Sequence, residues 1–208
     1  MKKTVSLIHS SNGCLKWLDG IGFFPANPDG VYNREYWDKY VGYARTPRGQ
    51  NITSFRVALV RKWAGWQPQA VDVGIGCGQF VMAMNCFGYD VNPVGVTWLK
   101  ANHRWINPWV QPCNVLTFWD SLEHIRNPVK LLANARRWIF VSMPIFSGMD
   151  HVAASKHFRP DEHYWYFSED GLIRFMRKRG FTCREVRWEE TYLGRDDIGT
   201  FVFERVRG

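Results

Sequence analysis

The stretch VDVGIGCGQF, residues 71–80, decides the fold of this chain. It starts with apolar residues apart from Asp72, as in a strand buried inside a sheet, and three glycines then follow at alternate positions. Glycine suits a tight turn because it adopts positive φ without steric cost. A buried strand that enters a glycine-rich turn predicts a nucleotide-binding α/β fold.

The spacing of these glycines separates one kind of nucleotide from another. The dinucleotide fingerprint Gly-x-Gly-x-x-Gly would need a glycine where Gln79 stands, and no Gly-Lys-Ser/Thr follows to make a P-loop. Asp72 would also repel a pyrophosphate. A ligand that carries an ammonium and a sulfonium group and no phosphate suits this carboxylate better, and S-adenosylmethionine (SAM) is such a ligand.

A second carboxylate supports this interpretation. Asp90 stands 18 residues after Asp72, at the end of the second predicted strand, CFGYDV. A carboxylate at this point can accept hydrogen bonds from both ribose hydroxyls of an adenosine. The pattern is therefore Asp-x-Gly-x-Gly-x-Gly, a strand, and then a ribose-binding acid.

Strands and helices are predicted to alternate along the rest of the chain. Buried strands are predicted at residues 70–74, 86–91, 113–119 and 138–144, and two final strands at 181–190 and 199–206. Helices are predicted at 51–64, 79–84, 94–104, 128–136 and 168–180. This order predicts a mainly parallel sheet with helices on both faces and an antiparallel C-terminal edge strand.

Composition limits the class of protein. The chain has 208 residues, enough for a large core, and no apolar run reaches the roughly 18 residues that a membrane helix needs. Its five cysteines form no CxxC pair, which argues against a cysteine zinc site and fits a reducing, cytoplasmic location. The high aromatic content and compact size fit a bacterial or virus-encoded enzyme. The formal charge of +8 is compatible with binding to nucleic acid, with binding to an anionic substrate, or with a role in solubility alone.

Taken in order, these motifs resemble those of the class I SAM-dependent methyltransferases, over roughly residues 51–206. The first motif is VDVGIGCGQF and the second GYDVNP; CNVLTFWDSLEHI, WIFVSMPIF and FSEDGLIRFMRKRGF are similar to the later ones. The resemblance implies a Rossmann-like sheet of seven strands, or six if WINPWVQP, residues 105–112, has lost the third strand. Residues 51–208 would form the SAM-binding domain.

The resemblance also implies which residues bind SAM. They are Asp72, Gly74, Ile75, Gly76, Gly78, Asp90, Val91, Asn92 and Trp119. The segment between Asn92 and Cys113 is short and lacks the usual acidic or amide contact to adenine. Arg56 is a candidate for the methionine carboxylate on charge alone.

Residues 1–50 are expected to form an irregular, aromatic cap segment over the mouth of the cofactor site. The expectation comes from the family and from an aromatic series: Tyr32, Tyr36, Trp37, Tyr40 and Tyr43. Within it, NREYWDKYVGY can form a short helix with Tyr36 and Tyr40 on one face.

Two segments carry candidate catalytic residues. After the fourth-strand motif, WDSLEHIRNP places Asp120 and His124 on one side of a helical turn, and His124 can serve as a general base with an ordinary pKa near 6.5. Alternatively, Asp120 caps a helix and His124 packs beside the cofactor. His163 is the second candidate base.

His163 belongs to DHVAASKHFRPDEHYWYF, residues 150–167, which is predicted to be a lid that faces the substrate. Arg159 and Lys156 can hold an anionic group there, and Tyr164, Trp165 and Tyr166 can stack on a ring. Alternatively, these aromatic side chains cover the edge of the sheet and belong to the hydrophobic core. The six-residue spacing of the three histidines matches no simple ligand set, so no metal site is predicted.

Methyl transfer to an oxygen or nitrogen of a small molecule is the preferred function, with no membrane partner. Two alternatives stay open. A nucleic-acid methyltransferase is suggested by the charge and by the basic stretch at residues 174–187, although the Asp/Asn-Pro-Pro-aromatic motif of base-amine enzymes is missing after the fourth strand. A catalytically silent binding or assembly module is suggested by the short middle region.

Overall fold

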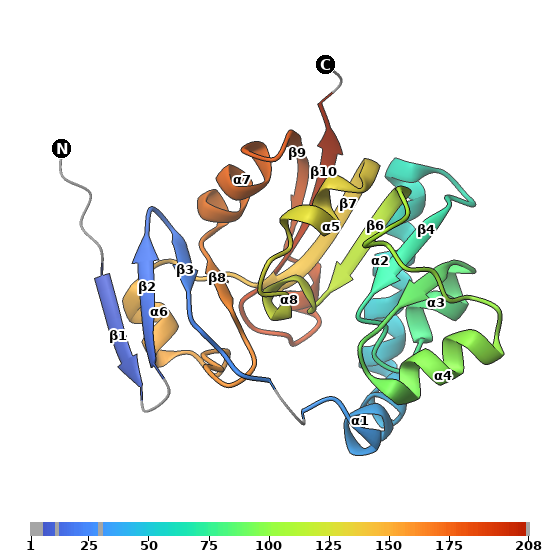
Figure 1. Ribbon diagram of the computed structural model, residues 1–208, viewed down its shortest axis with the longest axis horizontal. Helices are drawn as coiled ribbons and strands as arrows, with labels where there is room; N and C mark the ends of the chain where they lie inside the picture. Colours follow the sequence, from blue (N-terminus) through green and yellow to red (C-terminus); the bar gives the residue numbers. More distant parts are fainter. Residues whose placement is uncertain (1–5, 11–12, 29–30, 207–208) are drawn as a thin grey trace.

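The computed structural model describes residues 6–10, 13–28 and 31–206, which form two β-sheets with surrounding helices (Figure 1). The main sheet has the order β5-β4-β6-β7-β10-β9, and β10 alone runs antiparallel to its neighbours. Its strands are β4 (Ala70–Val73), β5 (Phe87–Tyr89), β6 (Cys113–Trp119), β7 (Ala135–Pro144), β9 (Phe181–Arg187) and β10 (Ile198–Arg205). The predicted fold is confirmed, with one refinement: β10 lies one place in from the edge, because β9 pairs outside it.

The main sheet has six strands because the third strand of the family pattern is reduced to a single bridge. Trp105 makes an isolated parallel bridge with Gly88, next to β5. The Ile106 N–H donates to the Gly88 carbonyl at 3.1 Å, and the chain then leaves the sheet at Asn107-Pro108. Proline has no N–H to donate to a strand ladder, so WINPWVQP cannot continue as a strand.

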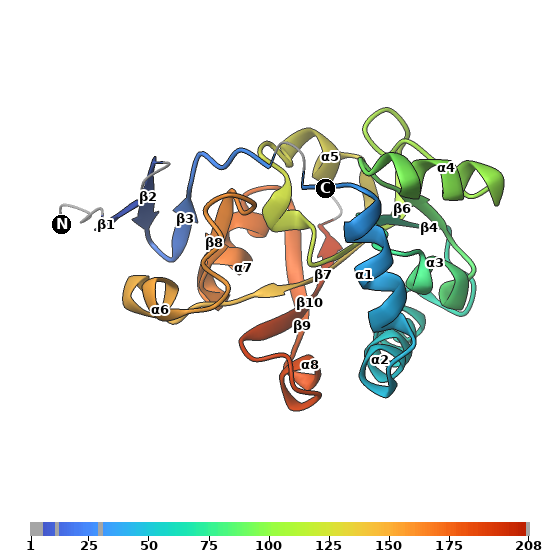
Figure 2. The ribbon, with the colours of Figure 1, turned by 90° about the horizontal axis from the view of Figure 1, so that it is seen from below.

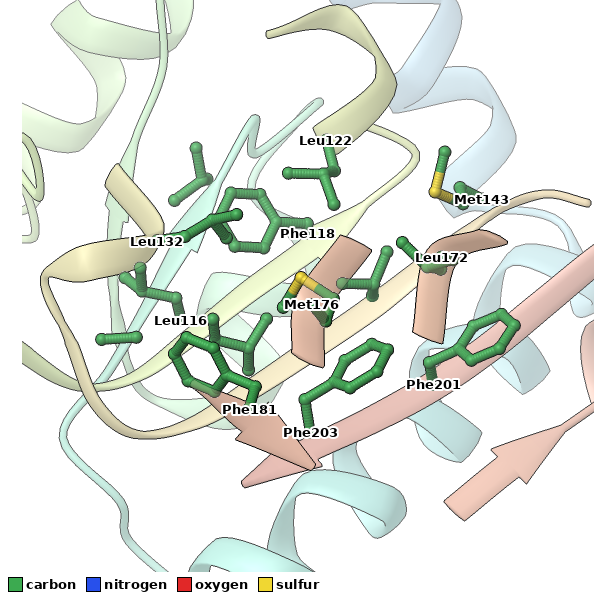
Figure 3. Close-up of a cluster of buried hydrophobic side chains, with 14 of the residues drawn as sticks. Leu116, Phe118, Leu122, Leu132, Met143, Leu172, Met176, Phe181, Phe201 and Phe203 are labelled. Carbon is green, nitrogen blue, oxygen red and sulfur yellow. The ribbon is translucent and has the colours of Figure 1, made fainter. Parts of the chain in front are cut away.

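The two faces of the main sheet bury different side chains. On one face Ile139 and Val141 of β7 join a cluster that includes α5 (Val129–Ala133) and α7 (Glu169–Arg177), shown in Figure 3. On the other face Trp138 and Phe140 join a cluster with α1 (Arg34–Ala44), α2 (Pro47–Ala64), α3 (Gln79–Met84) and α4 (Pro93–Ala101). Because both faces are covered, the middle of β7, residues 138–141, is a continuous apolar run and not an alternating one.

Residues at the N-terminus were expected to be irregular, and this expectation is wrong. They form β1 (Ser6–Ser10), β2 (Gly13–Leu18) and β3 (Ile21–Phe23), and β3 pairs with β8 (Trp165–Phe167) to complete a second sheet. This sheet and α6 (Met149–Ala154) bury their own cluster, which includes Leu15, Phe24 and Tyr166. The segment predicted as one long loop therefore contains a helix and a strand.

Helix α1 forms over the predicted stretch, and its position matters for the site. Asn33 starts it by accepting a hydrogen bond from the Tyr36 N–H at 3.0 Å. Tyr36 and Tyr40 share a face, with ring centroids 4.9 Å apart. Figure 2, the view from below, shows α1 in front of the main sheet.

Helix α2 begins earlier than predicted. It starts at Pro47, where Thr46 accepts a hydrogen bond from the Gly49 N–H at 3.1 Å, so the expected boundary between residues 50 and 51 lies inside a helix. The signal was present in the sequence: threonine at the N-cap and proline at the first helical position. Within the described ranges, the structure contains no helix with the length and apolarity needed to cross a membrane.

Candidate active site

A cavity of about 1310 Å³ opens at the carboxyl ends of β4, β5 and β6. These strands are parallel, and ligands of open α/β sheets bind at this edge. The cavity is lined by residues from the glycine turn, α1, α2, the segments after β5 and β6, and the lid, including Tyr32, Tyr36, Tyr40, Arg56, Asp72, Gly74, Ile75, Gly76, Asp90, Val91, Trp109, Trp119, Asp120, His124, Lys156, His157, Tyr164 and Arg195.

The glycine turn needs its glycines. Gly74, Gly76 and Gly78 have φ of +81°, +56° and +79°, which other residues rarely adopt. A Cβ at Gly74 would lie 2.6 Å from the Cβ of Ser121, and one at Gly78 would lie 2.6 Å from the Trp98 ring. The turn therefore packs against its neighbours without room for a side chain, which leaves the backbone at Gly74 and Gly76 on the cavity wall.

Asp90 is held in place by the turn and keeps spare acceptor capacity. Its Oδ2 accepts from the Ile75 N–H at 2.8 Å and its Oδ1 from the Asn92 N–H at 2.7 Å. A carboxylate has about four lone-pair sites, so roughly two remain for a ligand in the cavity. Burial raises the pKa of this carboxyl above its usual range, and the two backbone donors oppose that rise.

Asp72 lies at the base of the same cavity, only 1% exposed. Its Oδ1 accepts from the Thr117 hydroxyl at 2.6 Å. Burial raises its pKa to about 7, while the hydrogen bond from Thr117 and the charge of Arg56 lower it. Burial disfavours the negative charge of the ionised carboxylate. A cationic ligand stabilises that charge, so the site favours such a ligand.

Asp120, a candidate catalytic residue, belongs to a buried ion-pair network. Its carboxylate accepts from Arg56 at 3.0 Å and from Arg195 at 2.8 Å. Burial alone would raise its pKa, but the two guanidinium groups hold the pKa well below the usual range. Asp120 therefore stays ionised and paired, which makes it a poor proton acceptor.

Glu190, in α8 (Glu189–Tyr192), completes this network, and sequence reasoning missed it. It is 0% exposed and accepts from Arg56 Nε and Nη2, both at 2.8 Å, from Arg195, and from the Ser142 hydroxyl at 2.8 Å. Arg56, proposed for the cofactor carboxylate on charge alone, thus has two protein partners in Glu190 and Asp120. No local motif marks Glu190, because two of its partners, Arg56 and Ser142, are far away in the sequence.

The two candidate bases, His124 and His163, lie together. Their ring centroids are 4.5 Å apart, and Tyr32 Oη lies 3.0 Å from His124 Nδ1. Burial is the main cause that lowers the pKa of both imidazoles below the usual value, so both are uncharged near pH 7. His124 lies on the cavity wall, whereas His163 is 5% exposed behind it.

Glu123 joins this pair of histidines, a grouping that the sequence did not suggest. It is 1% exposed, and its Oε2 has no hydrogen-bond partner. One ligand atom each from Glu123, His124 and His163 lies within 4.8 Å of the others. The spacing of His163 from His151 and His157 predicted no metal site, but the fold gives His163 different neighbours.

The remaining predicted residues divide between cavity and core. Tyr164, Lys156, Val91 and Trp119 line the cavity; Arg159, Trp165, Gly78 and Asn92 do not. Tyr166 is fully buried, and the Trp165 indole N–H donates to the Ile125 carbonyl at 3.0 Å, so the core alternative describes these two aromatics. The Asn92 side chain caps α4 and donates to the Asn33 carbonyl at 2.9 Å.

Comparison with known proteins identifies the family. A family model described as a methyltransferase domain matches residues 30–186, most of the chain. The chain belongs to the methyltransferase domain family. This methyltransferase is a SAM-dependent enzyme with a Rossmann-like class I fold. The cavity fits that cofactor, because the glycine turn brings backbone to the wall and Asp72 and Asp90 offer carboxylates there.

The methyltransferase fold is shared with several solved structures at low sequence identity. Magnesium protoporphyrin IX methyltransferase from Synechocystis PCC 6803 with bound SAH has a TM-score of 0.60 at 12% identity, over 84% of this chain and 96% of that one. A 1,6-didemethyltoxoflavin-N1-methyltransferase from Burkholderia thailandensis gives 0.61 at 12%, over 97% and 100%. The cyclase SpnF gives 0.61 at 12%, over 89% and 99%, so the fold alone does not fix a reaction. No curated protein matches this methyltransferase.

Proposed function

We propose that this methyltransferase moves the methyl group of SAM to an oxygen or nitrogen of a small-molecule acceptor that is bound in the same cavity. One observation carries the proposal. A single cavity of about 1310 Å³ reaches from the Asp72 and Asp90 carboxylates to His124 and Tyr164. A pocket for one ligand is usually about 300–1,000 Å³, so this one has room for a cofactor and an acceptor.

The cofactor half of the cavity is built around the two carboxylates. In this proposal Asp90 accepts the ribose hydroxyls with the lone pairs that Ile75 and Asn92 leave. Asp72 faces the ammonium and sulfonium end, and Val91 and Trp109 offer apolar surface to adenine in place of the missing third-strand contact. SAM, when bound, supplies a methyl group activated by its sulfonium.

The acceptor half is aromatic. Tyr36 and Tyr40 of α1 form a continuous edge-to-face and tilted series with Tyr32, which precedes the helix, with centroid distances of 5.3 and 4.9 Å. Tyr164 lies on the wall contributed by the lid. These rings hold a flat acceptor and exclude water, which aligns the nucleophile with the methyl group. Uncharged His124 is in position to take a proton from the acceptor.

A small molecule is favoured over nucleic acid by where the basic stretch lies. Residues 174–187 do not line the cavity. Within the stretch, Arg184 pairs with Glu204 at 2.9 Å and Arg187 pairs with Glu185 at 3.0 Å. The porphyrin and toxoflavin methyltransferases that share this fold are also named for small-molecule acceptors.

The test has two parts. Calorimetric titration with SAM should show one site per chain, and Asp90→Ala should weaken binding at least tenfold; unchanged affinity would reject the ribose role. Transfer of tritiated methyl from SAM into fractionated lysate should then label the small-molecule pool. Label recovered in RNA or DNA instead would overturn the proposed acceptor class.

A further inference from the structure

We propose that Glu123, His124 and His163 form a binding site for a divalent transition-metal cation of the Zn²⁺ type, at the acceptor end of the cavity. Cation binding is inferred from the geometry of these three residues. Only the use of the cation in catalysis rests on the proposed function.

The three side chains come from two segments that are joined by hydrogen bonds. The 3₁₀ turn Leu122–His124 follows β6, and the lid returns beside it just before β8. The Tyr164 N–H donates to the Glu123 carbonyl at 2.8 Å, and the Trp165 indole N–H donates to the Ile125 carbonyl at 3.0 Å. These bonds lie on either side of His124, so the register between the two segments is fixed.

The ligand types suit a transition metal. Two imidazoles and one carboxylate are a known set for catalytic zinc, with three protein ligands and an open position. Metal–ligand bonds of about 2.0–2.2 Å place the ligands of one ion roughly 3–4 Å apart. The observed ligand atoms lie within 4.8 Å of one another, so small side-chain rotations are enough.

The buried carboxylate of Glu123 would be stabilised by a bound cation. Its Oε2 is buried without a hydrogen-bond partner, and burying an unpaired carboxylate is unfavourable. The two uncharged imidazoles offer lone pairs but no countercharge. A divalent cation supplies that charge and uses all three ligands.

The surroundings of His124 support a ligand role. Tyr32 lies 3.0 Å from its Nδ1, and such an outer hydrogen bond orients the ring of a metal-binding histidine. His124 is also the member of the cluster that lies on the cavity wall. The cluster therefore adjoins the acceptor half of the cavity through His124.

With the cation bound, the acceptor class narrows to molecules that carry a hydroxyl group. A hydroxyl that coordinates the cation has a lower pKa and gives its proton to solvent. The resulting oxyanion forms the new C–O bond as the C–S bond of SAM breaks, which leaves S-adenosylhomocysteine and the methyl ether. In this state the imidazoles act as ligands and not as bases.

Cation binding can be tested without SAM. The untagged, full-length protein, stripped with a chelator, is titrated with Co²⁺, followed by visible absorption, and with Zn²⁺ by calorimetry. We expect one cation per chain, and at least tenfold weaker binding in Glu123→Gln and His163→Asn. His157→Gln is the matched control, since His157 also lines the cavity but lies outside the cluster, and it should bind as the wild type does.

Circular dichroism of each variant establishes that it is folded, and thermal unfolding gives a second reading: the cation should raise the Tm of the wild type and of His157→Gln only. Equal binding by Glu123→Gln and the wild type, or no stoichiometric binding by the wild type, would overturn the metal site. Because SAM is absent from this titration, such a failure leaves the proposed function intact, and failure of SAM binding leaves the metal site intact.

Discussion

At the residue scale, Asp72 makes the cofactor site sensitive to pH. Burial, opposed by Thr117 and Arg56, raises its pKa to about 7, so the carboxyl is mostly protonated at pH 6 and half ionised at pH 7. The ligand's ammonium keeps its proton over this range. SAM affinity should therefore rise about fivefold from pH 6 to pH 7, measured by calorimetry. Asp72→Asn should bind more weakly and lose this rise; a wild type without pH dependence would contradict the role of Asp72.

Gly74 gives a second prediction at this scale. Its φ is +81°, and an added Cβ would meet the Cβ of Ser121 at 2.6 Å. Gly74→Ala should lower the free energy of unfolding by about 1–3 kcal/mol, measured with urea. Gly42→Ala is the matched control, because Gly42 is in α1 with no atom within 4 Å of its Cβ position, and it should gain about 0.5–1 kcal/mol. Equal stability of the two variants would refute the packing argument.

At the element scale, Asn92 joins two helices. Its Oδ1 caps α4 by accepting from the Val94 N–H at 3.0 Å, and its Nδ2 donates to the Asn33 carbonyl, next to α1. Asn92→Ala should lose about 1–2 kcal/mol of stability. Asn92→Ser keeps a capping oxygen but not the donor to Asn33, so its loss should fall between the wild type and Asn92→Ala. An equal loss in both variants would show that the cap contributes nothing.

Some elements were readable from the sequence and others were not, for a physical reason. β4, β6 and α7 have patterns that local periodicity reveals: mainly apolar residues for strands buried on both faces, and an apolar stripe with Ser168 as N-cap for the helix. β3 and β8 have three residues each and exist because they pair across the chain. A strand stabilised by a distant partner leaves little local signal.

The same contrast holds for the site. Asp72, the glycines and Asp90 follow from the spacing along one strand-turn-strand unit. The contact of His124 with His163, and the burial of Glu123 beside them, depend on how the lid returns to β6. Spacing along the chain could name these residues as candidates but could not bring them together.

At the scale of the whole molecule, the Arg56–Glu190–Arg195–Asp120 network ties together segments that are up to 134 residues apart. Glu190→Gln leaves two buried arginines with one carboxylate, so it should cost about 3–5 kcal/mol in urea unfolding. Asp38→Asn, which breaks the exposed Arg34–Asp38 pair, should cost less than about 1 kcal/mol. A cost for Glu190→Gln as small as that of the surface variant would mean that the network does not stabilise the fold.

A crystal structure with S-adenosylhomocysteine would show directly whether the two carboxylates bind the cofactor. We expect the ribose hydroxyls within hydrogen-bond distance of the Asp90 carboxylate, the amino-acid end above Asp72 and the glycine turn, and the sulfur directed toward His124. A nucleoside bound elsewhere, or a ribose that makes no contact with Asp90, would contradict it.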